Sequence, residues 1–319
     1  MSVLVYIENP NNHLKKTGFE AAYYAHLTAK SLGTDAIALV IGKCENVDVL
    51  GKYGVSKIIH LNASEDVKFD PQTYTSMITT ASADHNCKIV LLAQTANGKS
   101  LAGRLGIRLN AGVVSGANSL PNVSNGFEVT KSVYSGKAIV TYKIETETKV
   151  VSIMGNTIQP VEVGNSVQPT LENQTIPTTK LKVLNNKTTE GTVPLPEAEL
   201  VVSAGRGMKG PENWAIIDDL ASVLGATTAC SRPVADSDWR PHHEHVGQTG
   251  VAIRPNLYIA IGISGAIQHL AGVNNSKVIV VINKDPEAPF FKAADYGVVG
   301  DLFEVVPRLT EALKKYKHA

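Results

Sequence analysis

The chain has 319 residues, of which 43% are hydrophobic and 18% are charged, a balance typical of a globular protein long enough to form two domains. Its formal net charge of +1 comes from acids and bases mixed along the chain, which disfavours binding to nucleic acid or to an anionic membrane. The three cysteines, Cys44, Cys87 and Cys230, are far apart and lack C-x-x-C spacing, which argues against a disulfide framework, a zinc site and an iron–sulfur cluster.

No apolar run reaches the roughly 18 to 20 residues that cross a bilayer, so we expect no transmembrane helix. The N-terminus enters a strand-like run at once, without a secretory signal or an Arg-rich leader. We therefore expect a cytoplasmic protein of a bacterium, or a mitochondrial matrix protein if a transit peptide has been removed.

The first part of the chain alternates apolar runs with helical patterns. The apolar runs predict strands at Val3 to Ile7, Ala36 to Ile41, Lys57 to Leu61 and Lys88 to Leu92. Helical patterns predict helices at Thr17 to Leu32, Asp70 to Ala83 and Gly98 to Leu109. Such alternation is typical of a largely parallel sheet flanked by helices.

The pattern changes after Val113, where strand-like segments and turn signals such as Asn125-Gly126 replace the helices. The segments are Phe127 to Val133, Ala138 to Ile144 and Lys149 to Met154. We expect them to form an antiparallel extension of the N-terminal domain. Residues 155–198 are proline-rich and predict a strand or two plus a linker. We place the domains at residues 1–194 and 195–319.

Strand and helix patterns resume after the linker. Apolar segments predict strands at Leu200 to Ser203, Ala226 to Cys230, Leu257 to Ile261 and Val278 to Ile282. The stretch from Pro211 to Leu224 predicts a helix that Gly225 ends. The sequence thus predicts an α/β protein of two domains, each with a mostly parallel sheet flanked by helices, of which the second is Rossmann-like.

The segment around residue 262 carries the clearest functional signal. A strand-like run ends at Gly262, which permits a tight turn, and Ser264 and Gly265 then open a helical pattern. We expect Ser264 to be the helix cap or a phosphate ligand, with free N–H groups facing an anion. Asn283 follows the next apolar run. Because ligands bind beyond the carboxyl ends of parallel strands, these features predict a bound nucleotide.

Other motifs follow predicted strands but also fit plainer structural roles. Gly205-Arg206-Gly207 is a candidate ligand loop or a tight turn with a solvated arginine. Arg232, after Ser231, is a candidate ligand cation or a surface arginine that caps carbonyls. The loop Val246-Gly-Gln-Thr-Gly250 exposes Gln248 and Thr249 between two glycines, as either a ligand contact or an ordinary turn.

The cluster His242-His243-Glu244-His245 contains good metal ligands. Consecutive loop histidines rarely converge on one ion, and no distant partner motif is evident, so we expect no metal. The segment Gln94-Thr-Ala-Asn-Gly98 ends a strand and starts a helix, and in isolation it suggests a second nucleotide site.

The amino-acid sequence of the C-terminal half resembles that of the electron transfer flavoprotein α subunit. The match is carried by Tyr258 through His269, Gly272 and Val281-Ile-Asn283. It extends over roughly residues 199 to 316, through Gly205–Gly207, Ser231-Arg232, Val246–Gly250 and Asp295–Asp301, whereas the N-terminal half resembles the family mainly in layout. The resemblance implies an FAD-binding C-terminal domain and an N-terminal domain that holds no cofactor and serves as a scaffold and partner surface.

The resemblance also implies contacts with the flavin ring. Arg206 would lie against the ring or its phosphates, and Ser231 and Arg232 would contact the isoalloxazine. A cation at these positions would favour negatively charged reduced flavin. The hydroxyl of Thr249 would lie near N5. His245 stands where the family more often has glutamine, and we expect it to touch the ring.

The remaining implied contacts involve the pyrimidine, the phosphates and the adenosine. Gly262, Ser264 and Gly265 would form the turn that holds the pyrophosphate, with Gln268 one turn further. His269, which alone would be read as a structural histidine, would donate to the flavin pyrimidine carbonyl. Asn283 and Asp301 would bind the adenosine part of FAD.

The expected function is electron transport rather than substrate conversion. An electron carrier needs positioning and redox tuning, which fits the absence of any acid/base dyad or nucleophile triad in the sequence. The resemblance implies a heterodimer with a β subunit that holds AMP, soluble dehydrogenases as donors and a membrane quinone oxidoreductase or a similar acceptor. The alternative is an NAD- or FAD-dependent oxidoreductase that acts on its own small substrate.

Overall fold

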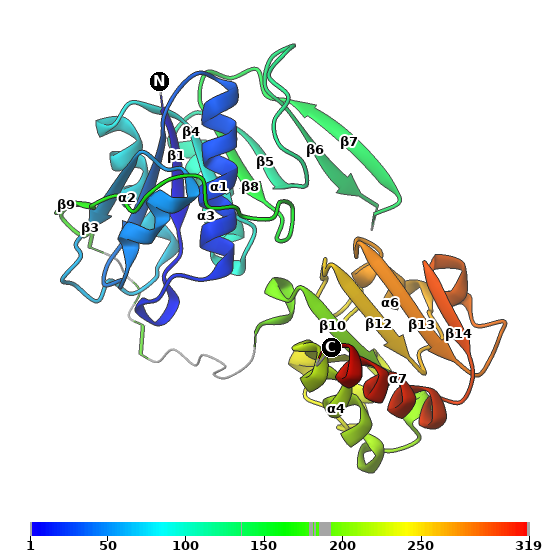
Figure 1. Cartoon of the computed structure of the whole chain (residues 1–319). Helices are drawn as coiled ribbons and strands as arrows, with labels where there is room; N and C mark the ends of the chain where they lie inside the picture. Colours follow the sequence, from blue (N-terminus) through cyan, green and yellow to red (C-terminus); the bar gives the residue numbers. More distant parts are fainter. Residues whose placement is uncertain (1, 135, 179–180, 182, 185–192, 318–319) are drawn as a thin grey trace. The chain divides into compact units, whose positions relative to one another are not determined.

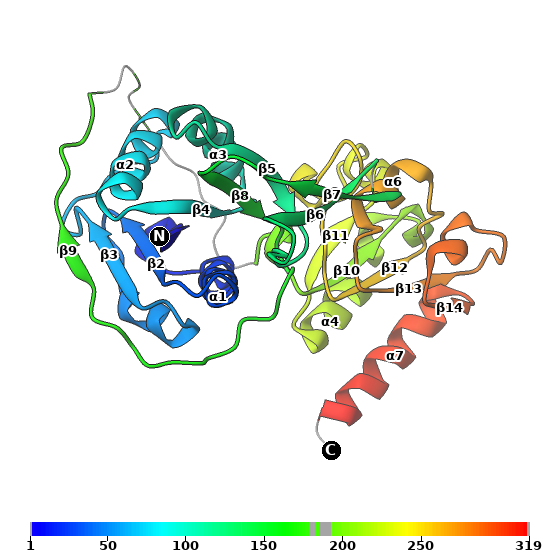
Figure 2. The same ribbon diagram turned by 90° about the horizontal axis from the view of Figure 1, so that it is seen from above.

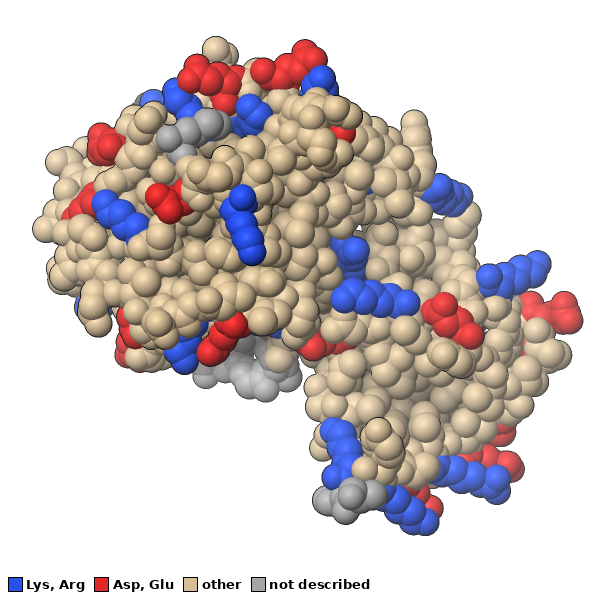
Figure 3. Space-filling view, turned by 45° about the horizontal axis from the view of Figure 1, so that its top comes forward, with Lys and Arg blue, Asp and Glu red and all other residues tan. Residues whose placement is uncertain are grey.

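The computed structural model describes residues 2–134, 136–178, 181, 183–184 and 193–317. Contacts within the chain define two compact units, the first containing residues 1–133 and 139–187 and the second containing residues 134–138 and 188–319. Among the described residues, no helix is both long enough and apolar enough to span a membrane. On the face drawn in Figure 3, acidic and basic side chains are interspersed without a continuous basic field.

The first unit is built on a seven-stranded sheet with the order β5-β8-β4-β1-β2-β3-β9, in which every neighbouring pair is parallel. The strands are β1 (Ser2–Ile7), β2 (Ala36–Ile41), β3 (Lys57–Leu61), β4 (Cys87–Ala93), β5 (Gly112–Ala117), β8 (Lys149–Ile153) and β9 (Thr170–Glu172). One face is covered by α1 (Lys16–Ser31), and the other by α2 (Pro71–Asp84) and α3 (Ala96–Arg108) (Figure 2). The parallel sheet predicted for this part of the chain is confirmed.

The extension of the first unit is smaller than the sequence predicts. Strands β6 (Glu128–Val133) and β7 (Ala138–Lys143) form the expected antiparallel pair. The segment Lys149 to Met154 was wrongly grouped with them, because β8 lies between β4 and β5 in the parallel sheet. Four of its five residues are buried, as expected for a central strand covered on both faces. The neighbouring strand β5 was not predicted.

The second unit is built on a five-stranded parallel sheet with the order β11-β10-β12-β13-β14. Its strands are β10 (Leu200–Ala204), β11 (Thr227–Cys230), β12 (Leu257–Ile261), β13 (Val278–Asn283) and β14 (Tyr296–Val299). Helices α4 (Ala215–Leu224) and α7 (Leu302–Lys317) pack on one face, whereas α6 (Ile267–Val273) covers the other (Figure 1). A short helix, α5 (Arg232–Ala235), follows β11.

The strand order of the second unit fixes where a ligand is expected. The chain passes from β10 to β11 on one side and then returns to β12 on the other side of β10. The connections therefore diverge between β10 and β12, and a crevice at the carboxyl ends of these strands is the usual ligand position in such sheets.

Short 3-10 turns complete the described chain. They are η1 (Pro10–Asn12), η2 (Val47–Tyr53), η3 (Leu195–Glu197), η4 (Arg206–Met208), η5 (Pro211–Asn213), η6 (His242–Glu244) and η7 (Pro289–Ala293). The single helix predicted from Pro211 to Leu224 is divided into η5 and α4, and Gly225 ends it in the left-handed region at φ +70°.

Candidate functional site

A cavity of about 280 Å³ lies among the loops that follow β11 and β12 in the second unit. Its lining includes residues that the sequence singled out on three separate segments, namely Arg232, His245, Gln248, Thr249, Gln268 and His269. Pro233, Val246 and Ala266 complete the lining. The fold thus brings together side chains that are up to 37 residues apart in the sequence, from Arg232 to His269.

Backbone contacts hold the cavity walls together. The N–H of Val246 donates to the carbonyl of Cys230 at 3.1 Å, which joins the 245–251 loop to the end of β11. The N–H of Gln248 donates to the carbonyl of Gln268 at 2.7 Å, which joins the same loop to α6. A Cβ atom on Gly272 would lie only 2.6 Å from the backbone of Gly247, so this close approach requires glycine.

Two imidazoles line the cavity, and burial disfavours the charged form of both. Nε2 of His269 lies 2.8 Å from the hydroxyl oxygen of Tyr258, whereas Nδ1 is buried without a hydrogen-bond partner. The pKa of His269 is lowered to about 4, mainly by burial and also by the nearby His245, against an opposing effect of the Val246 backbone. Burial also lowers the pKa of His245, with Asp236 acting in the opposite direction. Both rings are therefore expected to be neutral at neutral pH.

Arg232 brings a permanent positive charge to the cavity. It is the first residue of α5, and its Nε forms an ion pair with Oδ2 of Asp236 at 3.1 Å. The Arg232 side chain is 62% exposed, so solvent screens this pair and the arginine is not locked in place by it. Ser231, which is buried, precedes α5 at the end of β11.

The loop between β12 and α6 presents unpaired backbone donors. Gly262 and Gly265 adopt positive φ angles of +60° and +82°. A Cβ atom on Gly265 would lie 2.5 Å from Cβ of Phe290, so the turn depends on glycine. Among the described residues, the N–H groups of 265–268 donate no hydrogen bond. Such donors suit an anionic ligand.

The prediction that Ser264 caps the helix is wrong. Helix α6 begins at Ile267 with Ala266 as its N-cap, and no side chain caps it. The carbonyl of Ser264 instead accepts a hydrogen bond from the N–H of Phe290 at 3.1 Å, which ties this part of the loop to η7. The Ser264 side chain is exposed, so its proposed role as a phosphate ligand stays a prediction.

Glycines also bring the ends of β10 and β12 together. The N–H of Gly207 donates to the carbonyl of Gly262 at 3.1 Å, and a Cβ atom on Gly205 would lie 2.5 Å from that same oxygen. The tight turn of Gly205-Arg206-Gly207 is therefore a structural requirement. Arg206 is exposed at the start of η4, at the carboxyl end of β10.

Asn283 and Asp301 both have structural partners. The Asn283 amide donates to the carbonyl of Ile263 at 3.0 Å and accepts from the N–H of Asp285 at 3.1 Å. Oδ1 of Asp301 accepts from the N–H of Phe303 at 2.9 Å, so Asp301 caps the first turn of α7. Asn283 is the last residue of β13, and Asp301 lies two residues after β14, so both stand at carboxyl ends of strands.

The histidine cluster at 242–245 has no visible metal geometry. Among the described residues, no group of three or more His, Cys, Asp or Glu side chains is arranged to hold a metal ion. Glu244 is instead engaged by Arg240 at 2.6 and 2.8 Å, and the Arg240 guanidinium lies 5.5 Å from the centre of the Trp214 ring. This pair anchors η6, which leads directly into His245.

The sequence did not assign roles to Tyr258 or to the Arg240–Glu244 pair. Tyr258 was read only as part of an apolar strand, although a tyrosine hydroxyl in a buried strand needs a hydrogen-bond partner. The spacing of four residues between Arg240 and Glu244 was a signal for the ion pair.

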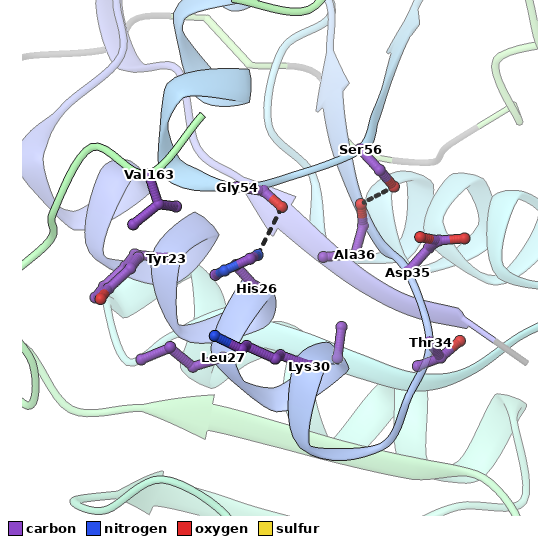
Figure 4. A pocket seen from close by; sticks show the side chains of 11 residues that line it. Tyr23, His26, Leu27, Lys30, Thr34, Asp35, Ala36, Gly54, Ser56 and Val163 are labelled. Atoms are coloured by element: carbon purple, nitrogen blue, oxygen red, sulfur yellow. Dashed lines mark hydrogen bonds between the residues drawn. The ribbon is translucent and has the colours of Figure 1, made fainter. Parts of the chain in front are cut away.

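Two further cavities contain none of the predicted site residues. One of about 570 Å³ lies beside α1 in the first unit and is lined by Tyr23, His26, Lys30 and Asp35 (Figure 4). There, Nδ1 of His26 lies 2.9 Å from the carbonyl oxygen of Gly54. Another, of about 800 Å³, is lined by Asp218, Arg240 and Glu244. These two cavities adjoin the amino ends of strands, opposite the edge where parallel sheets hold ligands.

The candidate cavity suits a ligand that is rich in hydrogen-bond acceptors and carries negative charge. Arg232 offers a cation, the 265–268 backbone offers unpaired N–H groups, and Nδ1 of His269 is a buried polar atom without a partner. FAD has phosphates and ring carbonyls that match such donors. The residues present therefore fit this cofactor.

Comparisons with known proteins cover both units. A family model described as the electron transfer flavoprotein FAD-binding domain matches residues 194–274, and one described as the electron transfer flavoprotein domain matches residues 3–181. The chain is 40% identical to the electron transfer flavoprotein subunit alpha of Bacillus subtilis, over 98% of this chain and 97% of that protein. It is 36% identical to the subunit of the same name from Syntrophomonas wolfei, over 98% of both, and 35% identical to Protein FixB of Escherichia coli O157:H7, over 90% of this chain and 93% of that protein.

Proposed function

Because the chain belongs to the electron transfer flavoprotein α-subunit family and functions in electron transfer, we propose that its second unit holds one FAD and carries electrons between other proteins. The donors would be soluble dehydrogenases, and the acceptor a membrane quinone oxidoreductase or a similar protein. The chain would convert no small substrate of its own.

One observation supports this proposal most directly. The cavity among the loops after β11 and β12 is lined by six of the candidate contacts, namely Arg232, His245, Gln248, Thr249, Gln268 and His269. A shared cavity is what a common ligand of these side chains would require, and this supports the proposal. The cavity lies at the carboxyl edge of a parallel sheet.

The residues divide by the part of FAD that they would hold. Arg232, Thr249 and His269 would contact the flavin ring, together with Ser231, His245 and Gln248. The N–H groups of 265–268 and the Arg206 side chain would hold the phosphates, with Ser264 beside them and Gln268 one turn further. Asn283 and Asp301 would hold the adenosine part. Bound FAD would supply the redox chemistry.

The chain's own side chains would set the electrostatic environment of the ring. The positively charged guanidinium of Arg232 would favour added negative charge nearby. The neutral imidazole of His269 would contribute an N–H hydrogen-bond donor without adding a positive charge. Electron transfer requires no proton abstraction by these residues.

The first unit would serve as a scaffold and as the surface for a β subunit, the usual holder of AMP. In this proposal the domains comprise residues 1–194 and 195–319, and the heterodimer resides in the bacterial cytoplasm or in the mitochondrial matrix. Membership of an α-subunit family supports a β-subunit partner.

The test is to co-produce the chain with its β subunit and to identify released cofactors and bound chains by mass spectrometry. We expect one FAD per heterodimer. A dehydrogenase together with its substrate should reduce this FAD rapidly, whereas the substrate alone should not. A complex that oxidises or reduces metabolites without a second dehydrogenase would contradict the carrier function. A complex without FAD would contradict the cofactor assignment.

A further inference from the structure

The proposed FAD site contains a buried tyrosine that does not line the cavity. Tyr258 lies in β12 with 0% of its surface exposed, and its hydroxyl oxygen is 2.8 Å from Nε2 of His269. Phe290 packs against both rings, with centroid distances of 6.3 Å to Tyr258 and 5.7 Å to His269. The three rings therefore fix the distance and orientation between the phenol and the imidazole.

We infer that Tyr258 is a positioning residue, whose hydroxyl donates to Nε2 of His269 and holds the imidazole in the Nδ1–H tautomer that offers a donor to a carbonyl of the flavin. The inference rests on the proposed FAD site. Tyr258 itself would not touch the cofactor, because it acts only through His269.

The direction of the Tyr258–His269 hydrogen bond follows from the proton count. A neutral imidazole has one N–H and one acceptor nitrogen, and a phenol has one proton to donate. Burial raises the pKa of Tyr258 well above its ordinary value and lowers that of His269 to about 4, so both side chains are neutral at neutral pH. If Nε2 carried the imidazole proton, the only alternative acceptor that the described residues offer the phenol proton would be the buried Oγ of Ser203, which forms no hydrogen bond of acceptable geometry in the structure. That arrangement leaves a buried donor unsatisfied at a cost of about 1–3 kcal/mol.

The opposite arrangement uses every proton once an acceptor occupies the cavity. Tyr258 donates to Nε2, and the imidazole proton resides on Nδ1. Nδ1 is buried and has no hydrogen-bond partner in the structure, and His269 lines the cavity. The carbonyl of Val246 is the competing acceptor, although it makes no hydrogen bond of acceptable geometry with Nδ1. A ligand carbonyl would satisfy the proton completely.

The inference predicts a specific effect of removing one oxygen atom. In Tyr258→Phe, nothing selects between the two tautomers of His269, so part of the population presents an unprotonated Nδ1 to the ligand. We expect FAD to bind about tenfold more weakly, as for the loss of one buried hydrogen bond. The matched control is Tyr24→Phe, since Tyr24 is equally buried and donates to the carbonyl of Ser119 at 2.7 Å in the first unit. Tyr24→Phe should leave FAD affinity unchanged.

The decisive measurement is the nitrogen NMR spectrum of the histidine rings in the complete heterodimer, with FAD and after its removal. In the wild type, we expect Nδ1 of His269 to carry the proton in both states and its N–H resonance to shift when FAD binds. Loss of the resonances in His269→Asn assigns them. In Tyr258→Phe, both tautomers should be visible.

A double-variant cycle separates positioning from general packing. Asparagine at position 269 presents an amide N–H near the place of Nδ1 without requiring Tyr258. In the His269→Asn background, Tyr258→Phe should therefore change FAD affinity less than about twofold. If Tyr258→Phe weakens binding equally in both backgrounds, its effect is structural and the inference fails.

Three spectral results would overturn the inference, whether or not the Tyr258 variant folds. The first is a wild-type His269 that is protonated on Nε2. The second is a Tyr258→Phe protein that keeps only the Nδ1–H tautomer. The third is an Nδ1–H resonance that does not shift when FAD binds, because Nδ1–H still donates to the carbonyl of Val246. A wild-type complex that binds no FAD would instead contradict the proposed function, and the tautomer of its His269 would still show whether Tyr258 donates to Nε2.

Discussion

Asp301 illustrates how one side chain combines a structural role with a proposed ligand role. Its carboxylate caps α7 through a 2.9 Å hydrogen bond from the N–H of Phe303, and its proposed ligand is the adenosine of FAD. Asp301→Ala should cost about 1 kcal/mol of folding stability through loss of the cap and should weaken FAD binding. Asp301→Ser keeps a good capping oxygen, so it should retain stability and still lose FAD affinity. Chemical unfolding and FAD titration separate the two effects, and full FAD affinity in Asp301→Ser would remove this residue from the site.

Arg232 should influence the reduction potential through its charge. Arg232→Ala removes a cation that would favour reduced flavin, so we expect the potential to fall by an amount on the order of tens of millivolts. The effect is limited because the side chain is 62% exposed and is paired with Asp236. Asp236→Asn removes the opposing charge and should shift the potential upward. Redox titration of both variants provides the measurement, and shifts of the same sign would exclude an electrostatic role.

His269 should make stability depend on pH in the acidic range. Burial lowers its pKa from the ordinary value of 6.5 to about 4, so between these values the unfolded chain binds a proton that the folded chain does not. The contribution is fully present above pH 6.5 and is lost as the pH falls toward 4, by up to about 3 kcal/mol. The unfolding midpoint should therefore fall more steeply between neutral pH and pH about 5 in the wild type than in His269→Asn. Equal slopes would show that His269 is not held neutral.

At the residue scale, the sequence predicted where the site residues lie better than which residues they contact. The site candidates Arg232, Thr249 and His269 line one cavity, because strand ends and glycine turns in the sequence indicate where side chains emerge. Ser264 was wrongly given the cap, since its neighbour Phe290 comes from a distant segment that local patterns do not reveal. The partnership of Tyr258 and His269 was missed for the same reason.

At the element scale, buried strands were predicted closely. The expected segment Leu257 to Ile261 coincides with β12, and Ala36 to Ile41 coincides with β2. The sequence predicted that a segment forms a strand more accurately than it predicted which sheet the strand joins. Strand β8 was placed in the antiparallel extension because it follows two hairpin strands in the chain, yet it joins the parallel sheet beside β4 and β5. Strand pairing depends on long-range contacts that a single sequence does not display.

The loop between β12 and α6 should be more sensitive to an added methyl group at Gly265 than the end of α4 is at Gly225, although both glycines have positive φ. Gly265 has φ +82°, and an added Cβ would lie 2.5 Å from Cβ of Phe290. Gly225 has φ +70° but no atom within 4 Å of its added Cβ. Gly225→Ala should cost about 1 kcal/mol from backbone strain alone. Gly265→Ala should cost about 3 kcal/mol and should also lose FAD, because it adds a steric clash that displaces the loop.

Urea unfolding and FAD retention during dialysis measure these two costs. Equal destabilisation in the two alanine variants would contradict the proposed tight contact with Phe290. Normal FAD retention in Gly265→Ala would show that the 265–268 donors are not part of the cofactor site.

At the scale of the whole molecule, the two units differ in what their sequence reveals. Family similarity extends over both units, and the curated relatives match nearly the full length of the chain. The second unit shows its proposed ligand through glycine turns and unpaired donors, which are local features. A surface for a partner chain depends on the shape of many residues together, so the sequence suggested the β subunit only through the family resemblance.

The account depends on FAD binding at the carboxyl edge of the second sheet, and a crystal structure of the co-purified heterodimer tests this directly. It should show the flavin ring in the 280 Å³ cavity against Arg232, Thr249 and His269, with the phosphates at the N–H groups of 265–268. A crevice without flavin, or FAD bound to a different part of the complex, would contradict the account.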